Sequence, residues 1–235
     1  MAEQSEQSPQ RKAQKKDFVE IEFIGRNLAN NEIFDTNIKE EAKKINLELS
    51  GKPLIVRIGD GMVVKGFDEA LESKEIGKKY TIKLEPEKAF GKRQPNLARL
   101  IPMKVFIEQK IYPQAGMTLA LDNNLVKVMS VSGGRVMVDF NNPLAGKDVE
   151  YEFTIKRLVE DPKEKINAVQ RFYFGMEFEF DVDEHKKKII FKNVKLAPVL
   201  NLFKEKFKEI LGMDLEIFEQ KKKEEKYEDK KEEKK

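Results

Sequence analysis

Residues 92–145 differ in character from the sequence on either side of them. Before this segment, the alternating run Phe18–Phe23 and the extended run Leu54–Ile58 are typical of half-buried strands. After it, Val149–Leu158 alternates in the same way, as if the first sheet resumed. Inside it, two β-branched runs meet at Gly133–Gly134, a pattern that favours a β-hairpin. We therefore expect one domain that is interrupted by a second, inserted domain.

A third unit is expected from residue 161 onwards. Asp161 followed by Pro162 is the arrangement of a helix N-cap with proline at the first helical position. Farther on, apolar residues first recur with a period of two and later with helical spacing. The predicted elements are a helix from Pro162, a strand Phe172–Phe180, a turn Asp183–Lys186, a strand Lys188–Leu196 and a helix Val199–Leu211 closed by Gly212.

The composition excludes several classes of function. The 235 residues contain 45 basic and 42 acidic side chains, and a net charge of +3 gives no reason to expect a nucleic acid as partner. Without cysteine there is no thiol nucleophile, thiolate metal site or disulfide, so secretion has no support. The single histidine, His185, has acidic neighbours, but one imidazole beside mobile carboxylates is a poor chelator. We expect no metal or cofactor.

The two ends of the chain are polar. Residues 1–16 lack apolar periodicity and are expected to form a flexible tail, and residues 219–235 are rich in lysine and acid, which predicts a solvated charged tail. No apolar run has the length of a signal sequence or of a membrane span. The expected location is therefore the cytoplasm, with no membrane partner.

Short segments in a fixed order carry a resemblance to a known family. Phe34–Asp35, Gly59, Val63–Leu71 and Ala89–Gly91 resemble the signature segments of FKBP-type peptidyl-prolyl cis-trans isomerases. Asn142–Lys147 resembles the hinge at which the SlyD-like branch returns from its inserted chaperone domain. The resemblance spans about residues 18–160, and the C-terminal part is similar to the extension of the long archaeal members.

The resemblance implies an α+β fold. The expected isomerase domain is a twisted antiparallel sheet wrapped on a short helix, the inserted domain is mostly β, and the C-terminal domain combines a helix, a β-hairpin and a second helix. The expected domains are residues 17–91 plus 146–160 for the isomerase, 92–145 for the insert and 161–218 for the C-terminal domain.

Rotation about a prolyl bond needs an apolar cradle rather than a nucleophile or a proton relay. The barrier of about 20 kcal/mol comes from partial double-bond character, which desolvation and a twisted geometry weaken. By resemblance, Phe67 is the floor of the pocket, the backbone N–H of Val64 holds a substrate carbonyl and Asp35 orients the substrate at the rim. The full set of expected site residues is Phe23, Phe34, Asp35, Leu54, Val63, Val64, Phe67, Phe90 and Tyr151.

Four positions depart from the family pattern. Phe67 replaces a common tryptophan, Phe23 and Phe90 replace frequent tyrosines, and Leu54 stands where the family usually has an aromatic residue. The lost hydroxyls could alter substrate orientation and macrolide affinity, but the cradle stays apolar.

The insert of SlyD-like relatives binds exposed apolar stretches of unfolded chains, which raises the local concentration of proline near the pocket. Most apolar residues of the insert must form its own core, and methionines favour an adaptable surface. The candidates for client binding are Val105, Phe106, Ile107, Ile111, Tyr112, Met117, Leu119, Val126, Val128, Met129, Val136, Met137 and Phe140.

The expected function is isomerisation of X-Pro bonds in unfolded or nascent polypeptides held by the insert. One alternative is a holdase chaperone with a weak or inactive prolyl pocket, which the departures at Phe67 and Leu54 permit. Another is an RNA-associated module, suggested only by the basic clusters Arg11–Lys16 and Lys186–Lys188. The C-terminal domain could pair two copies of the chain or bind clients.

Overall fold

The computed structural model describes residues 11–121, 124–192 and 197–217, so the predictions for residues 1–10 and 219–235 lie outside the described residues. The chain divides into two compact units, Met1–Val159 and Glu160–Lys235. No helix in the described ranges combines the length and the apolar character needed to cross a membrane.

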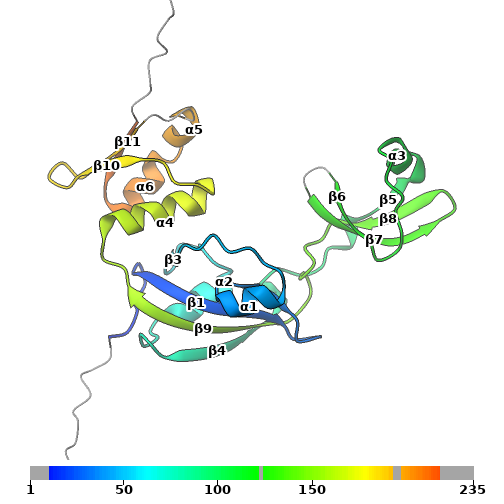
Figure 1. Ribbon diagram of the computed structural model, residues 1–235, viewed down its shortest axis with the longest axis horizontal. Helices are drawn as coiled ribbons and strands as arrows, with labels where there is room; N and C mark the ends of the chain where they lie inside the picture. Colours follow the sequence, from blue (N-terminus) through cyan, green and yellow to red (C-terminus); the bar gives the residue numbers. More distant parts are fainter. Residues whose placement is uncertain (1–10, 122–123, 193–196, 218–235) are drawn as a thin grey trace, which may run out of the picture. The chain divides into compact units, whose positions relative to one another are not determined.

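The first unit is built on a five-stranded antiparallel sheet with β1 at its centre (Figure 1). β1 pairs with β2, β3 and β9, and β9 also pairs with β4. Because β9 follows the insert while its neighbours precede it, the sheet is complete only after the chain has returned. The elements are β1 (Phe18–Asn27), β2 (Ile33–Thr36), α1 (Lys39–Lys44), β3 (Leu54–Arg57), α2 (Lys65–Leu71), β4 (Lys79–Leu84), the 3-10 turn η1 (Pro86–Lys88) and β9 (Val149–Leu158).

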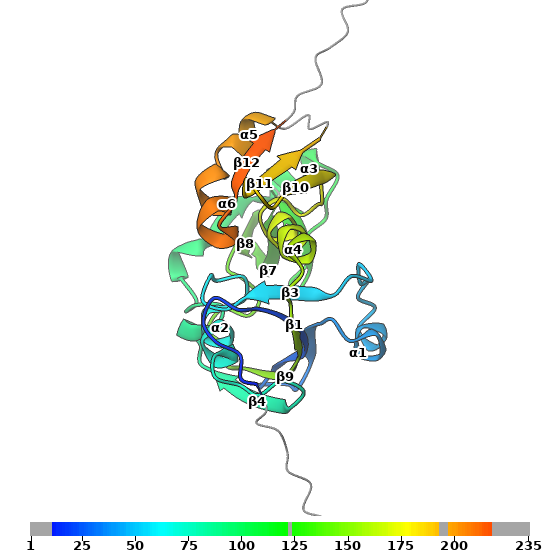
Figure 2. The same cartoon turned by 90° about the vertical axis from the view of Figure 1, so that its left-hand side faces the viewer.

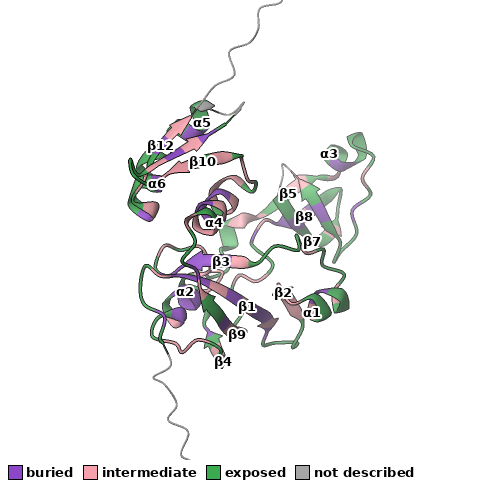
Figure 3. Cartoon of the chain, turned by 60° about the vertical axis from the view of Figure 1, so that its left-hand side comes forward, coloured by how far each residue is buried: buried purple, intermediate pink, exposed green. Residues whose placement is uncertain are grey.

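The core of this sheet follows the alternation in the sequence. In β1, Val19, Ile21 and Phe23 are buried on the face that α2 covers with Phe67 and Leu71. Figure 3 shows the buried residues along β1 and β3. The strands predicted at residues 18, 54 and 149 are thus confirmed.

The N-terminal segment differs from its prediction as a flexible tail. Residues 11–16 lie against the domain built on the five-stranded sheet, where Ala13 is 0 % exposed. The N–H of Ala13 donates to the carbonyl of Lys74 at 2.9 Å, and the N–H of Lys16 donates to Ile58 at 2.9 Å. Polar side chains hid this contact from the sequence pattern, because the stretch is held by backbone hydrogen bonds and one small apolar side chain.

The insert has a four-stranded sheet of its own, in the order β5-β8-β7-β6. The predicted hairpin joins β7 to β8 through Gly133 and Gly134, which both have positive φ. A short helix, α3, was not predicted. The elements are η2 (Pro95–Leu97), β5 (Ala98–Pro102), α3 (Met103–Glu108), β6 (Thr118–Leu121), β7 (Asn124–Ser132) and β8 (Arg135–Asp139).

The two chain crossings at the base of the insert are tied together. The Arg93 guanidinium lies 2.7 Å from the Asp139 carboxylate. The side chain of Asn141 accepts from the N–H of Gln94 at 2.8 Å and donates to its carbonyl at 2.9 Å. Below them, the N–H of Gly146 donates to the carbonyl of Gly91 at 2.8 Å. The chain therefore leaves and re-enters the domain of the five-stranded sheet at one place.

The second unit combines three helices with a three-stranded sheet in the order β10-β11-β12 (Figure 2). Asp161 caps α4 as predicted, accepting from the N–H of Lys163 at 2.7 Å. β12, parallel to β11, was not predicted. The elements are α4 (Pro162–Phe174), β10 (Phe180–Asp183), β11 (Lys188–Phe191), α5 (Ala197–Asn201), α6 (Lys204–Leu211) and β12 (Asp214–Ile217).

Two predictions for this unit were wrong. The expected strand Phe172–Phe180 begins inside the last turn of α4, which Gly175 ends at a φ of 68°, and only Phe180 enters β10. The aromatic residues alternate for another reason, since Phe174 and Phe178 both pack toward the centre of the unit, against Phe207 and Phe191. The expected helix Val199–Leu211 is broken into α5 and α6. The C-terminal end of the strand expected up to Leu196 lies outside the described residues.

Candidate functional site

Aromatic rings from five different segments form a continuous cluster in the domain of the five-stranded sheet. Phe67 of α2 stacks on Tyr151 of β9 with ring centroids 4.6 Å apart, and Tyr151 contacts Phe34 of β2 at 5.7 Å. Phe34 in turn meets Phe90, in the loop after η1, edge to face at 5.5 Å. Phe23 of β1 lies 5.8 Å from Phe67. Phe67, Tyr151 and Phe23 are buried, whereas Phe34 and Phe90 are half-buried and form the accessible side of the cluster.

Gly25 makes room for this arrangement. In the sheet, Gly25 of β1 pairs with Asp35 on one side and with Tyr151 on the other. A Cβ atom at this position would stand 2.6 Å from Cζ of Phe34 and 3.2 Å from Cε1 of Tyr151. The ring of Phe34 therefore occupies the space that a side chain on Gly25 would need.

The loop that carries Val63 and Val64 is anchored by a buried carboxylate. Asp68 of α2 accepts hydrogen bonds from the N–H groups of Gly59 and Gly61, both at 2.9 Å. The carbonyl of Val64 accepts from Phe67 and Asp68 at the start of α2, both at 2.9 Å. Both contacts hold the loop against the helix, and so fix the direction in which Val64 presents its backbone.

The N–H of Val64 has no hydrogen-bond partner within the described part of the chain. Val64 is the N-cap residue of α2 and has φ −58° and ψ 144°. A free N–H beside half-buried apolar side chains is suited to hold a carbonyl oxygen of a bound peptide.

Asp35 and Tyr151 interact electrostatically across Gly25. Burial raises the pKa of the Asp35 carboxyl above its ordinary value, and a backbone hydrogen bond from Thr36 opposes this shift. Burial, together with the nearby charge of Asp35, strongly raises the pKa of the Tyr151 phenol. Tyr151 is therefore protonated at neutral pH and can donate a hydrogen bond. It supplies a hydroxyl to a site in which the neighbouring positions 23, 34, 67 and 90 are phenylalanine.

The backbone of Phe23 is held by the residues that follow β2. The Thr36 hydroxyl donates to the carbonyl of Phe23 at 2.7 Å, and the N–H of Phe23 donates to Oδ1 of Asn37 at 2.9 Å. Asn37 also donates to the carbonyl of Ile21 at 2.7 Å. Its side chain thus continues the pairing of β1 after β2 has ended.

The structure brings the expected apolar residues of the pocket into one cluster. Phe23, Phe67 and Tyr151 are in its buried part, and Phe34, Leu54, Val63, Val64 and Phe90 pack against it. Asp35 lies at the edge of the cluster in register with Gly25; much of the residue is accessible, while its carboxyl is partly shielded from water. The sequence reasoning did not identify Gly25, Met62, Ile82 and Phe153, which belong to or border the same cluster. The alternation of β9 was the signal that could have placed Phe153 beside Tyr151.

The expected client-binding residues of the insert separate into three groups. Five of them form its core and are at most 8 % exposed, so they are removed from the client-binding surface: Phe106, Leu119, Val126, Val128 and Val136. Three are partly buried, namely Ile111, Met137 and Phe140. Exposed are Val105, Ile107, Tyr112, Met117 and Met129, together with Leu100 and Leu125, which the sequence reasoning missed. The apolar character of a residue does not show whether it lies on the core face or the solvent face of a strand, so the sequence could not separate these groups.

His185 lies in the exposed turn between β10 and β11. Within the described ranges, the structure contains no group of three or more histidine or acidic side chains placed to hold a metal ion.

Comparison with known proteins gives matches over the same segments. A family model described as FKBP-type peptidyl-prolyl cis-trans isomerase matches residues 9–109, and a model described as FKBP26, IF domain, matches residues 99–144. The second match lies inside the segment that was expected to be inserted.

Several curated proteins are similar to this chain. The short-type peptidyl-prolyl cis-trans isomerase of Methanocaldococcus jannaschii is 34% identical over 145 residues, which cover 60% of this chain and 90% of that protein. The FKBP-type 16 kDa isomerase of Escherichia coli is 31% identical over 111 residues, 45% of this chain and 74% of that protein. SlyD of Helicobacter pylori is 28% identical over 153 residues, 63% of this chain and 76% of that protein.

Proposed function

Since the chain belongs to the FKBP-type peptidyl-prolyl cis-trans isomerase family, we propose that the aromatic cluster around Phe67 and Tyr151 is its prolyl pocket. The protein is an isomerase of X-Pro bonds, and with its IF domain it is also a folding chaperone. The observation that carries the placement of the pocket is the unbroken chain of ring contacts from Phe90 to Phe67 beside the free N–H of Val64.

In this pocket a proline ring first meets Phe34 and Phe90, the half-buried rings, and is removed from water as it passes toward Tyr151 and Phe67. Loss of hydration weakens the polar resonance form of the imide and so lowers the barrier to rotation. The N–H of Val64 holds a carbonyl of the substrate, which fixes one side of the rotating bond. Asp35 at the rim and the phenol of Tyr151 orient the segment next to proline.

A pair of matched variants tests this placement. Phe34 and Tyr80 are half-buried aromatic residues on opposite sides of Phe67 in the ring contacts, because Tyr80 stacks on Phe153 at 5.7 Å and Phe153 contacts Phe67 at 5.1 Å. Phe34→Leu should lower kcat/KM for a short X-Pro peptide by roughly tenfold or more, whereas Tyr80→Leu should change it much less. Both rates are measured in a protease-free assay.

The same assay separates the isomerase from the holdase alternative. The isomerase with Phe34→Leu should still suppress aggregation of a denatured client, since the insert is unchanged. Equal turnover by Phe34→Leu and the unchanged protein would place the pocket elsewhere. If the unchanged protein shows no turnover at all, only the holdase function remains.

We further propose that the insert holds clients through its exposed side chains, of which Tyr112 is 73 % and Leu125 is 60 % exposed. Exposed apolar side chains on the insert can bury their surface against apolar stretches of an unfolded chain, which is favourable in water. A chain lacking residues 92–145 should refold a proline-limited protein more slowly than the full chain, while its turnover of a short peptide is retained. Equal refolding rates would remove the insert from the mechanism.

The C-terminal unit also exposes apolar side chains, and we propose that it pairs two copies of the chain in the cytoplasm. Leu202 is 80 % exposed, and Phe172, Met176 and Val199 are between 43 % and 49 % exposed. Sedimentation of the full chain should show a dimer that Leu202→Ser weakens, and cell fractionation tests the location. A monomer at all accessible concentrations would end the pairing proposal.

A further inference from the structure

The sheet of the C-terminal unit has an edge strand, β10, whose outer side has no partner strand in the described part of the chain. β10 pairs only with β11, in the register Phe180 with Phe191 and Val182 with Ile189. The N–H of Lys192 donates to the carbonyl of Glu179 at 2.9 Å, so residue 179 directs its backbone toward β11. In an antiparallel pair the direction alternates along the strand. The N–H and C=O groups of Phe180 and Val182 therefore point outward, away from β11.

These outward groups have no hydrogen-bond partner among the described residues. An edge of this kind is a template for another strand unless it is covered or blocked. β10 contains no proline and no lysine that would block it.

A groove runs between this edge and the first turns of α4. One cavity of about 770 Å³ is lined by Asp161–Lys163 from the start of α4 and by Phe180–His185. A second cavity of about 490 Å³ continues it, sharing Lys163 and Phe180 and extending along Glu177–Phe180. The groove therefore follows the outer edge of β10 over its whole length, all within the C-terminal unit.

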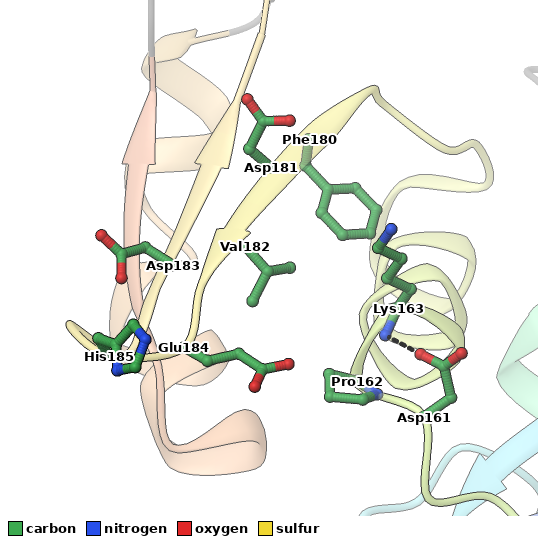
Figure 4. A pocket seen from close by; sticks show the side chains of 9 residues that line it. All are labelled: Asp161, Pro162, Lys163, Phe180, Asp181, Val182, Asp183, Glu184 and His185. Carbon is green, nitrogen blue, oxygen red and sulfur yellow. Dashed lines mark hydrogen bonds between the residues drawn. The ribbon is translucent and has the colours of Figure 1, made fainter.

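The two faces of β10 differ in chemistry. Figure 4 shows Phe180 and Val182 pointing toward α4 and Pro162, while Asp181 and Asp183 lie on the other face of the strand. Phe180 and Val182 are only half-buried, although they belong to the face of the sheet that packs on the helices. A strand added at this edge would cover them with every second side chain, and its remaining side chains would lie beside Asp181 and Asp183.

The charge of the groove selects the side chains of that strand. The residues lining the larger cavity include four carboxylates, Asp161, Asp181, Asp183 and Glu184, against Lys163 and His185. Lys192 pairs with Asp181 at 2.7 Å and Lys186 pairs with Asp183 at 3.6 Å, so the charge left for an occupant is mainly that of Asp161 and Glu184. Glu184 has no ion-pair partner in the described residues, and its carboxylate points toward Pro162 across the groove (Figure 4). The fitting occupant is therefore a strand in which apolar residues alternate with lysine or arginine.

We propose that the edge of β10 binds an extended, basic segment of another polypeptide by β-strand addition, with apolar side chains in the groove against Phe180, Val182 and Pro162. This mode of recognition takes affinity from main-chain hydrogen bonds and selectivity from the alternate side chains. It gives the protein a client site that needs no proline and is separate from both the prolyl pocket and the insert.

The experiment uses the full chain and a fluorescent, end-capped octapeptide of alternating lysine and valine, followed by anisotropy. Val182→Pro removes an outward N–H and leaves the bonds to β11 in place, because the N–H of Val182 does not take part in that pairing. It should weaken binding by about tenfold or more, and Val182→Ala, which keeps the N–H, should weaken it much less. N-methylation of alternate residues of the peptide should have the same effect as the proline.

The charges are tested with a matched pair of variants. Glu184→Gln combined with Asp161→Asn, which preserves the capping oxygen of α4, should weaken binding several-fold and reduce its dependence on salt. Glu205→Gln, an exposed acid of α6 outside the groove, should leave both unchanged. Equal binding of an alternating glutamate and valine peptide would overturn the assignment of charge.

Hydrogen exchange of the Phe180 and Val182 amides provides a readout that does not depend on any variant. Both amides should exchange fast in the free protein and slowly with the lysine and valine peptide. Slow exchange of these amides before any peptide is added would overturn the proposal. If that protection rises with protein concentration, a second copy of the chain covers the edge of β10. If it does not, the chain's own residues cover the edge. Unchanged exchange with saturating peptide would also overturn it.

Discussion

The ring of Phe34 lies so close to Gly25 that a Cβ atom there would stand 2.6 Å from the ring carbon Cζ. Gly25 lies inside β1 and pairs with residues of both neighbouring strands. Its backbone is not in the left-handed region, so space rather than conformation requires glycine here. The accessible side of the proposed pocket thus depends on a residue without a side chain.

Gly25→Ala should therefore displace Phe34. We expect a loss of about 1–3 kcal/mol in the free energy of unfolding from overpacking, and a fall of roughly tenfold in kcat/KM on a short X-Pro peptide. Denaturant titration and the protease-free assay measure the two effects. In the double variant with Phe34→Leu, the stability losses should be less than additive, because the smaller side chain makes room. Full additivity would show that Phe34 is not what the new Cβ meets.

Asp68→Ala should destabilise the loop that presents Val63 and Val64. The change leaves the N–H groups of Gly59 and Gly61 without their acceptor, and each unsatisfied group costs about 1–3 kcal/mol where it is removed from water. Asp68→Asn keeps one carbonyl oxygen and should lose less. Glu69→Ala, at the next and exposed position of α2, serves as the control and should stay within about 0.5 kcal/mol of the unchanged protein. Equal losses at the two positions would contradict the anchoring role.

The stability of the isomerase domain should fall as the carboxyl of Asp35 ionises. Because burial raises the pKa of Asp35 above its ordinary value of 3.8, the folded state binds this proton more tightly than the unfolded state does. The stabilising contribution is therefore complete below the unfolded pKa and is lost as the pH rises through the folded pKa. Asp35→Asn should raise the melting temperature at pH 7 and have a smaller effect at pH 3.

If Asp35 orients the substrate, the same variant should turn over an X-Pro peptide more slowly although it is more stable. Tyr151→Phe provides the comparison, since it removes the phenol and keeps the ring. A variant Asp35→Asn that is less stable at pH 7 would contradict the sign of the pKa shift.

Asp139 at the base of the insert should show the opposite pH dependence. Burial alone would raise its pKa, but hydrogen bonds from Asn141 and Arg93 hold the pKa of Asp139 below 3.8. Its contribution to stability is present above the unfolded pKa and is lost as the pH falls through the folded pKa. Asp139→Asn should therefore weaken the insert at pH 7, as measured by amide exchange in β8, and converge with the unchanged protein in strong acid.

Exposed apolar residues of the insert should contribute to holding clients and little to folding. Tyr112→Ser with Leu125→Ser should reduce suppression of aggregation several-fold, and should change the free energy of unfolding by less than about 1 kcal/mol, because surface substitutions have small effects. Val128→Ala, in the core of the insert, should do the reverse and cost about 1–3 kcal/mol. Identical chaperone activity in the surface variant would exclude this face.

Local signals in the sequence predicted the parts of the fold that depend on them. Asp161 before Pro162 marked the start of α4, and the alternation of Val149–Leu158 marked β9 with its correct bounds. The ordered motif segments pointed to Phe34, Phe67 and Phe90, and the structure brings their rings into one cluster around Tyr151. The prediction of a strand at Phe172–Phe180 was wrong, because apolar residues can also alternate with a period of two where the last turn of a helix meets a coil.

Other features could not be read from local pattern. Which apolar residues of the insert are buried depends on the pairing β5-β8-β7-β6, which is set by contacts far apart in the chain. The short strand β12 is stabilised by parallel pairing with β11 and carries no pattern of its own. The role of Gly25 follows from the position of one ring on another strand.

The hydrogen bond from Gly146 to Gly91 joins the two ends of the insert at a single point. For the isomerase sheet, the insert acts as a loop whose two ends are held together. The length of the insert therefore adds little to the entropic cost of closing that loop. The register of β9 against β1 and β4 is set by residues outside it. The inserted domain should therefore be replaceable. A different client-binding domain whose ends are equally close could be grafted between Gly91 and Gly146 without repacking the core of the isomerase domain.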